Sequence, residues 1–510
     1  MARILWADDE IDSLKPHVLF LQQKGHQVDA VNSGNEAVKL IQEQSFDLVF
    51  LDENMPGMSG LTALEKIKII RPNIPVVMIT KSEEEMIMEE AIGKQISDYL
   101  IKPVNPNQIL IAIKKLLDSK RLVIESNTTS YQQKFREISE DLSQKMDLNG
   151  WTELYKKLTY WELQLEMSDE NMSQIFDMQK EEANQLFSKF IDHNYNDYLL
   201  NDEHIFSHRL LKKELFPKLN NEPYYLIVID NLRYDQWLII KPYVEELFEI
   251  EKEDLYTSIV PTTTQYARNA LFAGISPLDI KRKYPDKWVN EESNEGKNLH
   301  EEYFLNENLK RNFINLKSSY NKITHLNAGK KLVSNLENLK NNQLNTIVYN
   351  FVDTLSHARS DMEVIKELAE DESAYRSITL SWFKHSPLYD IMKKISEKPC
   401  KVMLTTDHGT IRVKNPSKVL GPKSTNNNMR YKVSKNLSFN KKDVLQANDP
   451  EKILLPKTHL SSSFIFAKED RFFVYPNNYN QYVNLYNDTF QHGGISMEEM
   501  LIPYAFLKSK

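Results

Sequence analysis

Short apolar runs that each end on a polar or charged residue are the feature that most constrains the fold of this 510-residue chain. In residues 1–120 such runs alternate with amphipathic segments such as "GLTALEKIKII". This alternation predicts a parallel sheet with helices on both faces. In such sheets the chemistry gathers at the carboxyl ends of the strands. The residues at those ends are Asp8 and Asp9 after "ARILWA", Asp52 in "FDLVFLD", Thr80 in "IPVVMIT" and Lys102 in "DYLIKP".

Three of these polar residues are carboxylates, namely Asp8, Asp9 and Asp52, and we expect them at one edge of the sheet. Carboxylates converge where a cation holds them, and ligation by oxygen atoms alone suits Mg²⁺. Lys102 supplies a fixed positive charge, and Thr80 supplies a hydroxyl group for a phosphoryl oxygen. The set therefore predicts a site at which Asp52 becomes an aspartyl phosphate.

The segments "WADDE", "LDENMPGMSG", "MIT" and "DYLIKP" resemble those of a two-component response-regulator receiver domain, over the whole of residues 1–120. The resemblance implies a five-stranded, parallel, doubly wound sheet and a sensor histidine kinase as the phosphodonor. The site residues that it implies are Asp52 as the phosphoacceptor, Asp8, Asp9, Asp52 and the Asn54 carbonyl as Mg²⁺ ligands, Thr80 and Tyr99 as the switch pair, and Lys102 as the phosphate partner.

A helical segment follows. Residues 107–216 contain no proline and a single glycine, Gly150. Apolar residues recur there in steps of three and four, which is the pattern of one helix face. We interpret residues 121–205 as a small helical bundle that serves either as a packed spacer or as a signalling coupler. The residues that carry the pattern are Trp151, Leu154, Leu158, Trp161 and Leu165.

The composition argues against a DNA-binding, membrane-spanning or secreted protein. The net charge of −8 argues weakly against DNA binding, because neutralising phosphates requires a basic face. The longest apolar runs are far too short to span a membrane, and the acidic N-terminus does not resemble a signal peptide. With Cys400 as the single cysteine, no internal disulfide can form. These features predict a cytoplasmic protein whose metal ligands, if any, are histidines and carboxylates.

Residues 206–510 return to the strand pattern. The apolar runs "YYLIVID", "NTIVYNFVD" and "KVMLTTD" end on Asp230, Asp353 and Asp407, which predicts a second α/β sheet with a site at its carboxyl edge. Residues 412–455 are polar and rich in Asn and Lys, and we expect a long loop or insertion over that site.

Histidines accompany these aspartates. His408 follows Asp407 directly, Asp353 and His357 are four residues apart, and His492 stands in "FQHGGISMEEMLIP". Taken singly, each histidine has a plain structural explanation, and the "DHG" pair is also typical of a polar strand end with an Asx turn. Three His and three Asp together are what a two-zinc site without cysteine requires. Two ions about 4 Å apart stabilise both the attacking and the leaving oxygens of phosphoryl transfer.

The order of these segments resembles the alkaline phosphatase superfamily, particularly its PglZ-type branch and the nucleotide pyrophosphatase/phosphodiesterases. The resemblance implies that the threonine run "PTTT" supplies the nucleophile. Thr264 matches the family's P-T-x-T pattern, while Thr262 and Thr263 remain open. The ligands that the resemblance implies are Asp230, Thr264, Asp407 and His408 for one Zn²⁺, and Asp353, His357 and His492 for the other. Arg268, Arg233 and Arg430 are candidates for phosphate contacts.

The combination of a receiver, a helical spacer and a PglZ-type domain resembles the response regulators tied to type IX secretion in gliding and periodontal bacteria. The resemblance implies a secretion-motor partner, a sigma-factor link to transcription, no DNA binding by the protein itself, and a homodimer when phosphorylated. We expect a zinc-dependent phosphodiesterase or phosphohydrolase, gated by phosphorylation of Asp52, that acts on cyclic or linear nucleotides or oligonucleotides. The alternative is a non-catalytic signalling adaptor with a structural metal site.

Overall fold

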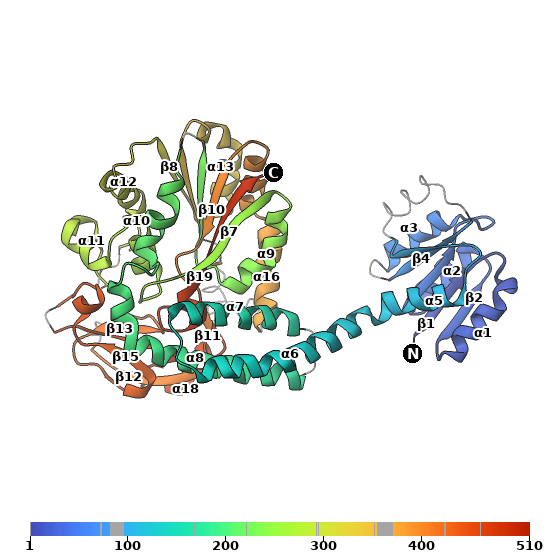
Figure 1. Cartoon of the computed structure of the whole chain (residues 1–510), viewed down its shortest axis with the longest axis horizontal. Coiled ribbons are helices and arrows are strands. Elements are labelled where there is room, and N and C mark those ends of the chain that lie inside the picture. Colours follow the sequence, from blue (N-terminus) through green and yellow to red (C-terminus); the bar gives the residue numbers. More distant parts are fainter. Residues whose placement is uncertain are drawn as a thin grey trace. The chain divides into compact units, whose positions relative to one another are not determined.

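The computed structural model of the chain describes residues 2–71, 74–81, 96–166, 170–220, 222–291, 293, 295–350, 352–353, 371–422, 425–459 and 461–510. The chain divides into two compact units, Met1–Gln133 and Lys134–Lys510 (Figure 1).

The first unit is built on a five-stranded parallel sheet in the order β2-β1-β3-β4-β5, as expected. Its strands are β1 (Arg3–Ala7), β2 (Gln27–Val31), β3 (Leu48–Asp52), β4 (Val76–Thr80) and β5 (Asp98–Ile101). Its described helices are α1 (Lys15–Gln23), α2 (Gly34–Glu43), α3 (Gly60–Ile70) and α5 (Pro106–Ile113).

Alternate residues of these strands pack into two separate hydrophobic cores. Leu5 and Val49 pack into one cluster, and Ile4 and Trp6 pack into the other, because successive strand residues point to opposite faces. The sheet is therefore covered on both faces, and its polar strand ends are held in a fixed register.

Three long helices follow: α6 (Ser119–Ser143), α7 (Leu148–Leu165) and α8 (Glu170–Leu200). The Asp147 side chain caps α7 by accepting the Gly150 N–H at 2.8 Å. The predicted apolar stripe from Trp151 to Leu165 is buried. The helical linker is thus confirmed.

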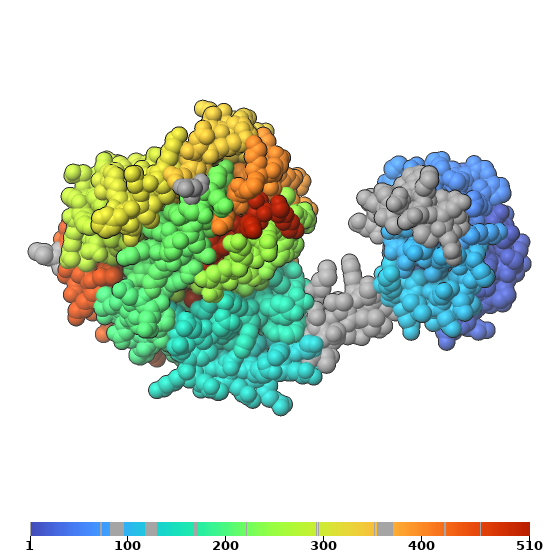
Figure 2. Space-filling model, turned by 45° about the horizontal axis from the view of Figure 1, so that its top comes forward, coloured from blue at the N-terminus to red at the C-terminus, as the bar shows by residue number. Residues whose placement is uncertain are grey.

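The helices α7 and α8 pack on the C-terminal α/β domain within the second unit (Figures 1 and 2). Asn184 of α8 donates to the Glu498 carboxylate at 2.9 Å, and Lys180 lies 3.2 Å from the same carboxylate. Glu162 of α7 binds Arg376 at 2.9 Å. Buried polar contacts of this kind join the linker helices to the domain that carries the second candidate site.

A six-stranded mixed sheet forms the centre of that domain, in the order β7-β19-β10-β6-β9-β8. Its strands are β6 (Tyr224–Ile229), β7 (Phe248–Thr257), β8 (Ser318–Ile323), β9 (Leu344–Tyr349), β10 (Lys401–Thr405) and β19 (Leu501–Ser509). The neighbours β10, β6, β9 and β8 run parallel, while β19 is antiparallel to both β10 and β7. The carboxyl ends of β6, β9 and β10 therefore meet at one edge.

Helices lie on both faces of this sheet (Figure 1). The described helices of the domain are α9 (Tyr234–Glu245), α10 (Asn269–Ala273), α11 (Pro277–Lys283), α12 (Glu301–Arg311), α13 (Leu326–Asn335), α16 (Glu372–His385), α17 (Pro387–Ser396), α18 (Tyr479–Tyr486) and α19 (Met497–Met500). Of these, α18 lies beside β12, away from the six-stranded sheet (Figure 1). In the described part of the chain, every helix is too short or too polar to cross a membrane.

The segment 412–455 corrects the expectation of a long loop. It contains β12 to β15 and pairs with β16 and β17 in two small sheets, β14-β12-β17 and β13-β16-β15. Val419, Val433 and Val444 are buried in it, and in β12 buried and exposed residues alternate, as they do in a strand with one face towards the core. The strands of this region are β11 (Ile411–Arg412), β12 (Asn415–Leu420), β13 (Tyr431–Ser434), β14 (Ser438–Phe439), β15 (Val444–Ala447), β16 (Ser463–Ala467), β17 (Arg471–Val474) and β18 (Phe490–Gln491).

Candidate active site

At the carboxyl edge of the receiver sheet, Lys102 binds two buried carboxylates. Its Nζ lies 2.7 Å from Asp52 Oδ1 and 2.9 Å from Asp8 Oδ2. Asp8, Asp9 and Asp52 each bring a ligand oxygen to within 4.8 Å of the others, and Asp9 is exposed. The acids thus form a candidate cation site in which Asp9 is exposed to solvent.

The charges at this edge depend on one another. Burial raises the pKa of the Asp52 carboxyl group, the hydrogen bond from Lys102 opposes that shift, and the charge of Asp8 adds to it. Burial alone would lower the pKa of Lys102, but the hydrogen bonds with Asp52 and Asp8 outweigh burial and raise it. Lys102 is therefore a cation that lies beside Asp52.

The remaining predicted receiver residues differ in exposure. The Thr80 hydroxyl is buried and donates to the Glu53 carboxylate. The Tyr99 side chain is 41% exposed, and Asn54 is exposed next to Asp52. Their roles in switching and Mg²⁺ binding stay predictions.

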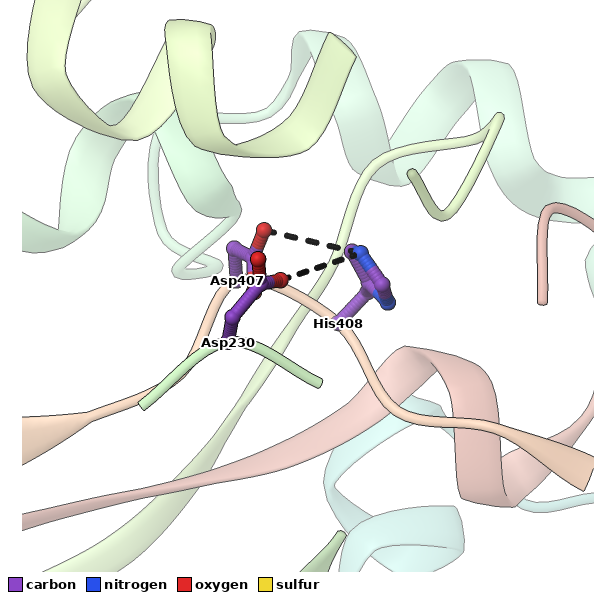
Figure 3. Close-up of side chains that lie close together, drawn as sticks. All are labelled: Asp230, Asp407 and His408. Carbon is purple, nitrogen blue, oxygen red and sulfur yellow. Dashed lines mark ion pairs between the residues drawn. The ribbon is translucent and has the colours of Figure 1, made fainter. Parts of the chain in front are cut away.

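In the C-terminal domain, Asp230, Asp407 and His408 converge from the ends of the adjacent strands β6 and β10 (Figure 3). His408 Nε2 lies 3.8 Å from Asp230 Oδ1 and 3.5 Å from Asp407 Oδ2. All three side chains are fully buried. Two carboxylates and an imidazole nitrogen therefore face one point, as the "DHG" segment suggested.

The threonine run contributes one hydroxyl group to this point. Thr264 begins the π-helical turn η6 (Thr264–Arg268), and its Oγ1 lies 3.5 Å from Asp230 Oδ1 and 3.4 Å from His408 Nε2. The Thr262 hydroxyl is used elsewhere, since it donates to the Gly494 carbonyl at 3.1 Å and accepts the Gly493 N–H at 2.9 Å.

A second pair lies beside the first cluster. Asp353 follows β9, and its Oδ1 lies 3.5 Å from His492 Nε2. The rings of His492 and His408 are stacked with centroids 4.3 Å apart. The predicted ligand His357 lies outside the described residues. The structure thus brings together Asp230, Thr264, Asp353, Asp407, His408 and His492.

Backbone carbonyl groups orient both histidine rings. Nδ1 of His408 lies 3.3 Å from the Gly409 oxygen, and Nδ1 of His492 lies 3.1 Å from the Thr262 oxygen. Because a carbonyl oxygen can only accept, Nδ1 carries the hydrogen atom, and the lone pair of the neutral ring is on Nε2. Burial lowers the pKa of His408 to about 4, so that ring is neutral near pH 7. Nε2 of His408 is thus oriented as a ligand atom. Burial alone would lower the pKa of His492, but the hydrogen bond with Asp353 and the charge of that carboxylate outweigh burial and raise it.

Three parts of the chain match known protein families. Residues 210–506, more than half of the chain, match the BREX system PglZ alkaline phosphatase-like domain. Residues 121–199 match the PorX response regulator linker domain, and residues 4–114 match the response regulator receiver domain. The chain is a PorX-type response regulator of the PglZ family.

Curated relatives resemble this PorX-type chain over a shorter stretch. The alginate biosynthesis transcriptional regulatory protein AlgB of Pseudomonas putida is 36% identical over 120 residues, which are 24% of this chain and 27% of that protein. The transcriptional regulatory protein ZraR of Escherichia coli is 35% identical over 114 residues, 22% of this chain and 26% of that protein. The chain thus spans about a quarter of the length of these relatives. A CheY-like receiver domain protein from Methanospirillum hungatei has 29% identity and a TM-score of 0.23, and the match covers 24% of this chain and 97% of that one.

The donors of the alkaline phosphatase-like domain fit a metal ion. Oδ2 of Asp407 is buried and accepts no hydrogen bond from the described residues; Arg268 Nη1 lies 3.8 Å away. Burial raises the pKa of Asp230, the Arg268 charge opposes this shift, and the carboxylates of Asp407 and Asp353 add to it. Crowded buried carboxylates beside the neutral imidazole of His408 are a donor set suited to Zn²⁺.

The three arginines that are candidates for phosphate contacts all bind carboxylates in this PorX-type chain, and their contact with phosphate stays a prediction. Each is buried and already paired with carboxylates, because a buried guanidinium requires a compensating charge. The partners are Asp235 and Glu372 for Arg233, Glu499 for Arg430, and Asp230 and Glu301 for Arg268. Of the three, Arg268 lies at the candidate metal site, where its Nη1 is 2.6 Å from Asp230 Oδ2.

Sequence reasoning also missed a residue of this site. Glu499 is fully buried, and its carboxylate accepts the Gly494 N–H at 2.8 Å beside the turn that follows His492. Its place in "HGGISMEEM" was the available signal, but the sequence alone does not distinguish Glu499 from Glu498.

Proposed function

We propose that this protein is a response regulator phosphorylated on Asp52, and that its C-terminal domain is a zinc-dependent phosphodiesterase or phosphohydrolase. The observation that carries the proposal is the position of the Thr264 hydroxyl, 3.5 Å from Asp230 and 3.4 Å from His408. A site that only stabilised the domain would not require a hydroxyl group among its ligands.

The candidate ligands divide into two sets. Asp230, Asp407, His408 and Thr264 would hold one Zn²⁺, and Asp353 and His492, with His357 by resemblance, would hold the other. Bound zinc lowers the pKa of a coordinated hydroxyl group and neutralises charge that develops on phosphoryl oxygens.

Thr264 is the nucleophile in this proposal. Its Oγ1 attacks phosphorus, the bond from phosphorus to the ester oxygen breaks, and the alcohol leaves with a proton. Water then hydrolyses the phosphothreonine and restores the hydroxyl group. Asp230 and His408 lie next to Oγ1 and would hold the same Zn²⁺, so they would position the hydroxyl group for attack. Arg268 holds the Asp230 carboxylate in place.

The proposed substrates are cyclic or linear nucleotides and oligonucleotides, and a sensor histidine kinase is the proposed phosphodonor. Phosphorylation of Asp52, with Mg²⁺ bound by Asp8, Asp9, Asp52 and the Asn54 carbonyl, would gate hydrolysis and form a homodimer. Kinship with PorX-type regulators supports a cytoplasmic role in type IX secretion, with a secretion-motor component and a sigma factor as partners.

Hydrolysis assays test the enzymatic part. The zinc-loaded protein is assayed with chromogenic phosphodiester, phosphomonoester and sulfate-ester substrates, and then with cyclic and linear oligonucleotides. We expect the phosphodiester to be preferred, and we expect turnover to require both zinc and Thr264. An inactive zinc-loaded protein, with or without a phosphodonor for Asp52, would favour the adaptor function instead.

A further inference from the structure

Glu499, which the proposed chemistry does not use, touches three of the segments that carry candidate ligands. Its Oε1 accepts the Gly494 N–H at 2.8 Å and lies 3.5 Å from the Thr262 hydroxyl. Its backbone carbonyl accepts the Gly409 N–H at 3.2 Å. Gly494, Thr262 and Gly409 belong to the His492 turn, the threonine run and the "DHG" turn, so one buried residue cross-links these three segments.

Arg430 compensates the charge of Glu499. Its Nε lies 3.2 Å from Oε1, its Nη2 lies 2.6 Å from Oε2, and both side chains are fully buried. The remaining amino group donates to the backbone carbonyl of Arg471. The contact is therefore a two-point, charge-assisted pair of defined geometry. Arg430 directly precedes β13, so it belongs to the segment 412–455, which otherwise had no assigned role.

The turn after His492 packs directly on this pair. A Cβ atom on Gly494 would lie 2.7 Å from the Arg430 guanidinium and 2.5 Å from the Ala467 carbonyl oxygen. Gly493 has a φ of +118°, which favours glycine. The turn therefore has no free space in which to shift while Arg430 and Glu499 stay paired.

The same contacts reach the histidine ring and the threonine run. The Gly493 N–H donates to Thr262 Oγ1 at 2.9 Å, and the Thr262 carbonyl accepts His492 Nδ1 at 3.1 Å. Thr262 precedes Thr264 by two residues. A change in the turn thus alters both the orientation of the His492 ring and the path of the chain to Thr264.

We propose that Arg430 and Glu499 are positioning residues that set the distance between the His492 and Thr264 sides of the candidate metal site. Groups that orient ligands typically contribute ten- to a hundredfold in metal affinity or activity. The inference rests on the proposed function, because only hydrolysis requires Thr264 and His492 to face the same substrate.

The test removes both charges together, because removing one alone leaves the other buried without a partner. The main variant is Arg430→Met with Glu499→Gln, which keeps the side-chain volumes. Arg430→Lys retains the charge but not the two-point geometry. Arg471→Met is the matched control, since Arg471 begins β17 in the other small sheet and its side chain pairs with Asp443 and Glu469.

Three measurements are made on the full chain. Zinc affinity is measured by competition with a chromophoric chelator, kcat and KM are measured on a chromogenic phosphodiester, and amide exchange of residues 489–496 is measured on zinc-free protein. In the double variant we expect zinc affinity to fall about ten- to hundredfold. We also expect kcat to fall more than KM changes, and amide exchange in residues 489–496 to become faster. The zinc affinity, kcat and amide exchange of Arg430→Lys should lie between those of the double variant and those of wild type. Arg471→Met should match wild type in all three.

A merely structural pair would give a different result. If the folded double variant kept wild-type zinc affinity and wild-type exchange in residues 489–496, the positioning role would be overturned. If wild type bound zinc but hydrolysed no ester, while the double variant lost zinc affinity and exchanged faster, the proposed enzymatic function would fail and the positioning of ligands would stand.

Discussion

The rings of His408 and His492 are stacked with centroids 4.3 Å apart and planes inclined by 20°. Two imidazolium ions at this distance would repel each other, and the neighbouring charge of His492 adds to the burial that lowers the pKa of His408 to about 4. His408 follows β10, and His492 follows β18. Their contact joins the two candidate ligand sets into one site, although the two histidines lie far apart in the chain.

Asp52 is expected to be the phosphorylated residue. Acetyl phosphate or beryllofluoride with Mg²⁺ should modify wild type and shift it towards a dimer, whereas Asp52→Ala should respond to neither. The carboxylate already contacts Lys102 at 2.7 Å and is the acceptor closest to that cation. Intact mass and light scattering provide the measurements. Asp47→Ala, at the opposite end of β3, is the control, and an equal response from Asp52→Ala would refute the receiver chemistry.

The number of zinc ions bound per chain should show whether each of the two ligand sets holds an ion. We expect about two ions per chain in wild type and about one in His492→Ala or Asp353→Ala, because losing one of few protein ligands leaves an open and weakly held ion. Elemental analysis after dialysis measures the ratio. His193→Ala, an exposed histidine on α8, should keep both ions. Wild-type protein without zinc after incubation with the ion would contradict this prediction.

Thr264→Val should abolish turnover while zinc binding and folding remain largely intact. The substitution keeps the side-chain volume and removes the oxygen that faces Asp230 and His408. We expect kcat to fall on the order of 10³-fold or more on a chromogenic phosphodiester, if the hydroxyl is the sole nucleophile.

Thr262→Val and Thr263→Val are the comparisons for that experiment. Thr262→Val should lower stability by about 1–3 kcal/mol, because it leaves the buried Gly493 N–H without an acceptor. Thr263→Val should lower turnover only mildly. Near-normal turnover in Thr264→Val with a dead Thr263→Val would reassign the nucleophile, and normal turnover in all three would indicate attack by water.

Arg376→Met should destabilise the contact between the linker helices and the α/β domain. Arg376 binds Glu162 at 2.9 Å and Asp235 at 3.1 Å, and both it and Asp235 are buried. Breaking a buried pair on one side typically costs about 3–5 kcal/mol. Urea denaturation followed by tryptophan fluorescence measures the change. Lys134→Met removes an exposed pair with Glu137 and should change little; equal stability of the two variants would show that the buried pair contributes nothing.

Much of the site could be predicted because its residues sit at recognisable strand ends. Asp230, Asp353 and Asp407 each terminate or follow an apolar run, and β6, β9 and β10 are buried strands that bring them together. The arginines could not be predicted in the same way. Nothing local to Arg233 or Arg430 shows that Glu372 or Glu499 will bury against it, since those partners come from distant elements.

By itself, the sequence determined the α/β class, the helical linker and the kinds of ligand, because the periods of its apolar residues and the polar ends of its strands are local properties. Only the tertiary structure decided which threonine faces the aspartates, which carboxylates neutralise the arginines, and that segment 412–455 folds into strands and supplies Arg430. The physical reason is that the free-energy cost of burying a charge or a hydroxyl group depends on its hydrogen-bond or ion-pair partner. That partner comes from a distant part of the chain and is determined by tertiary packing.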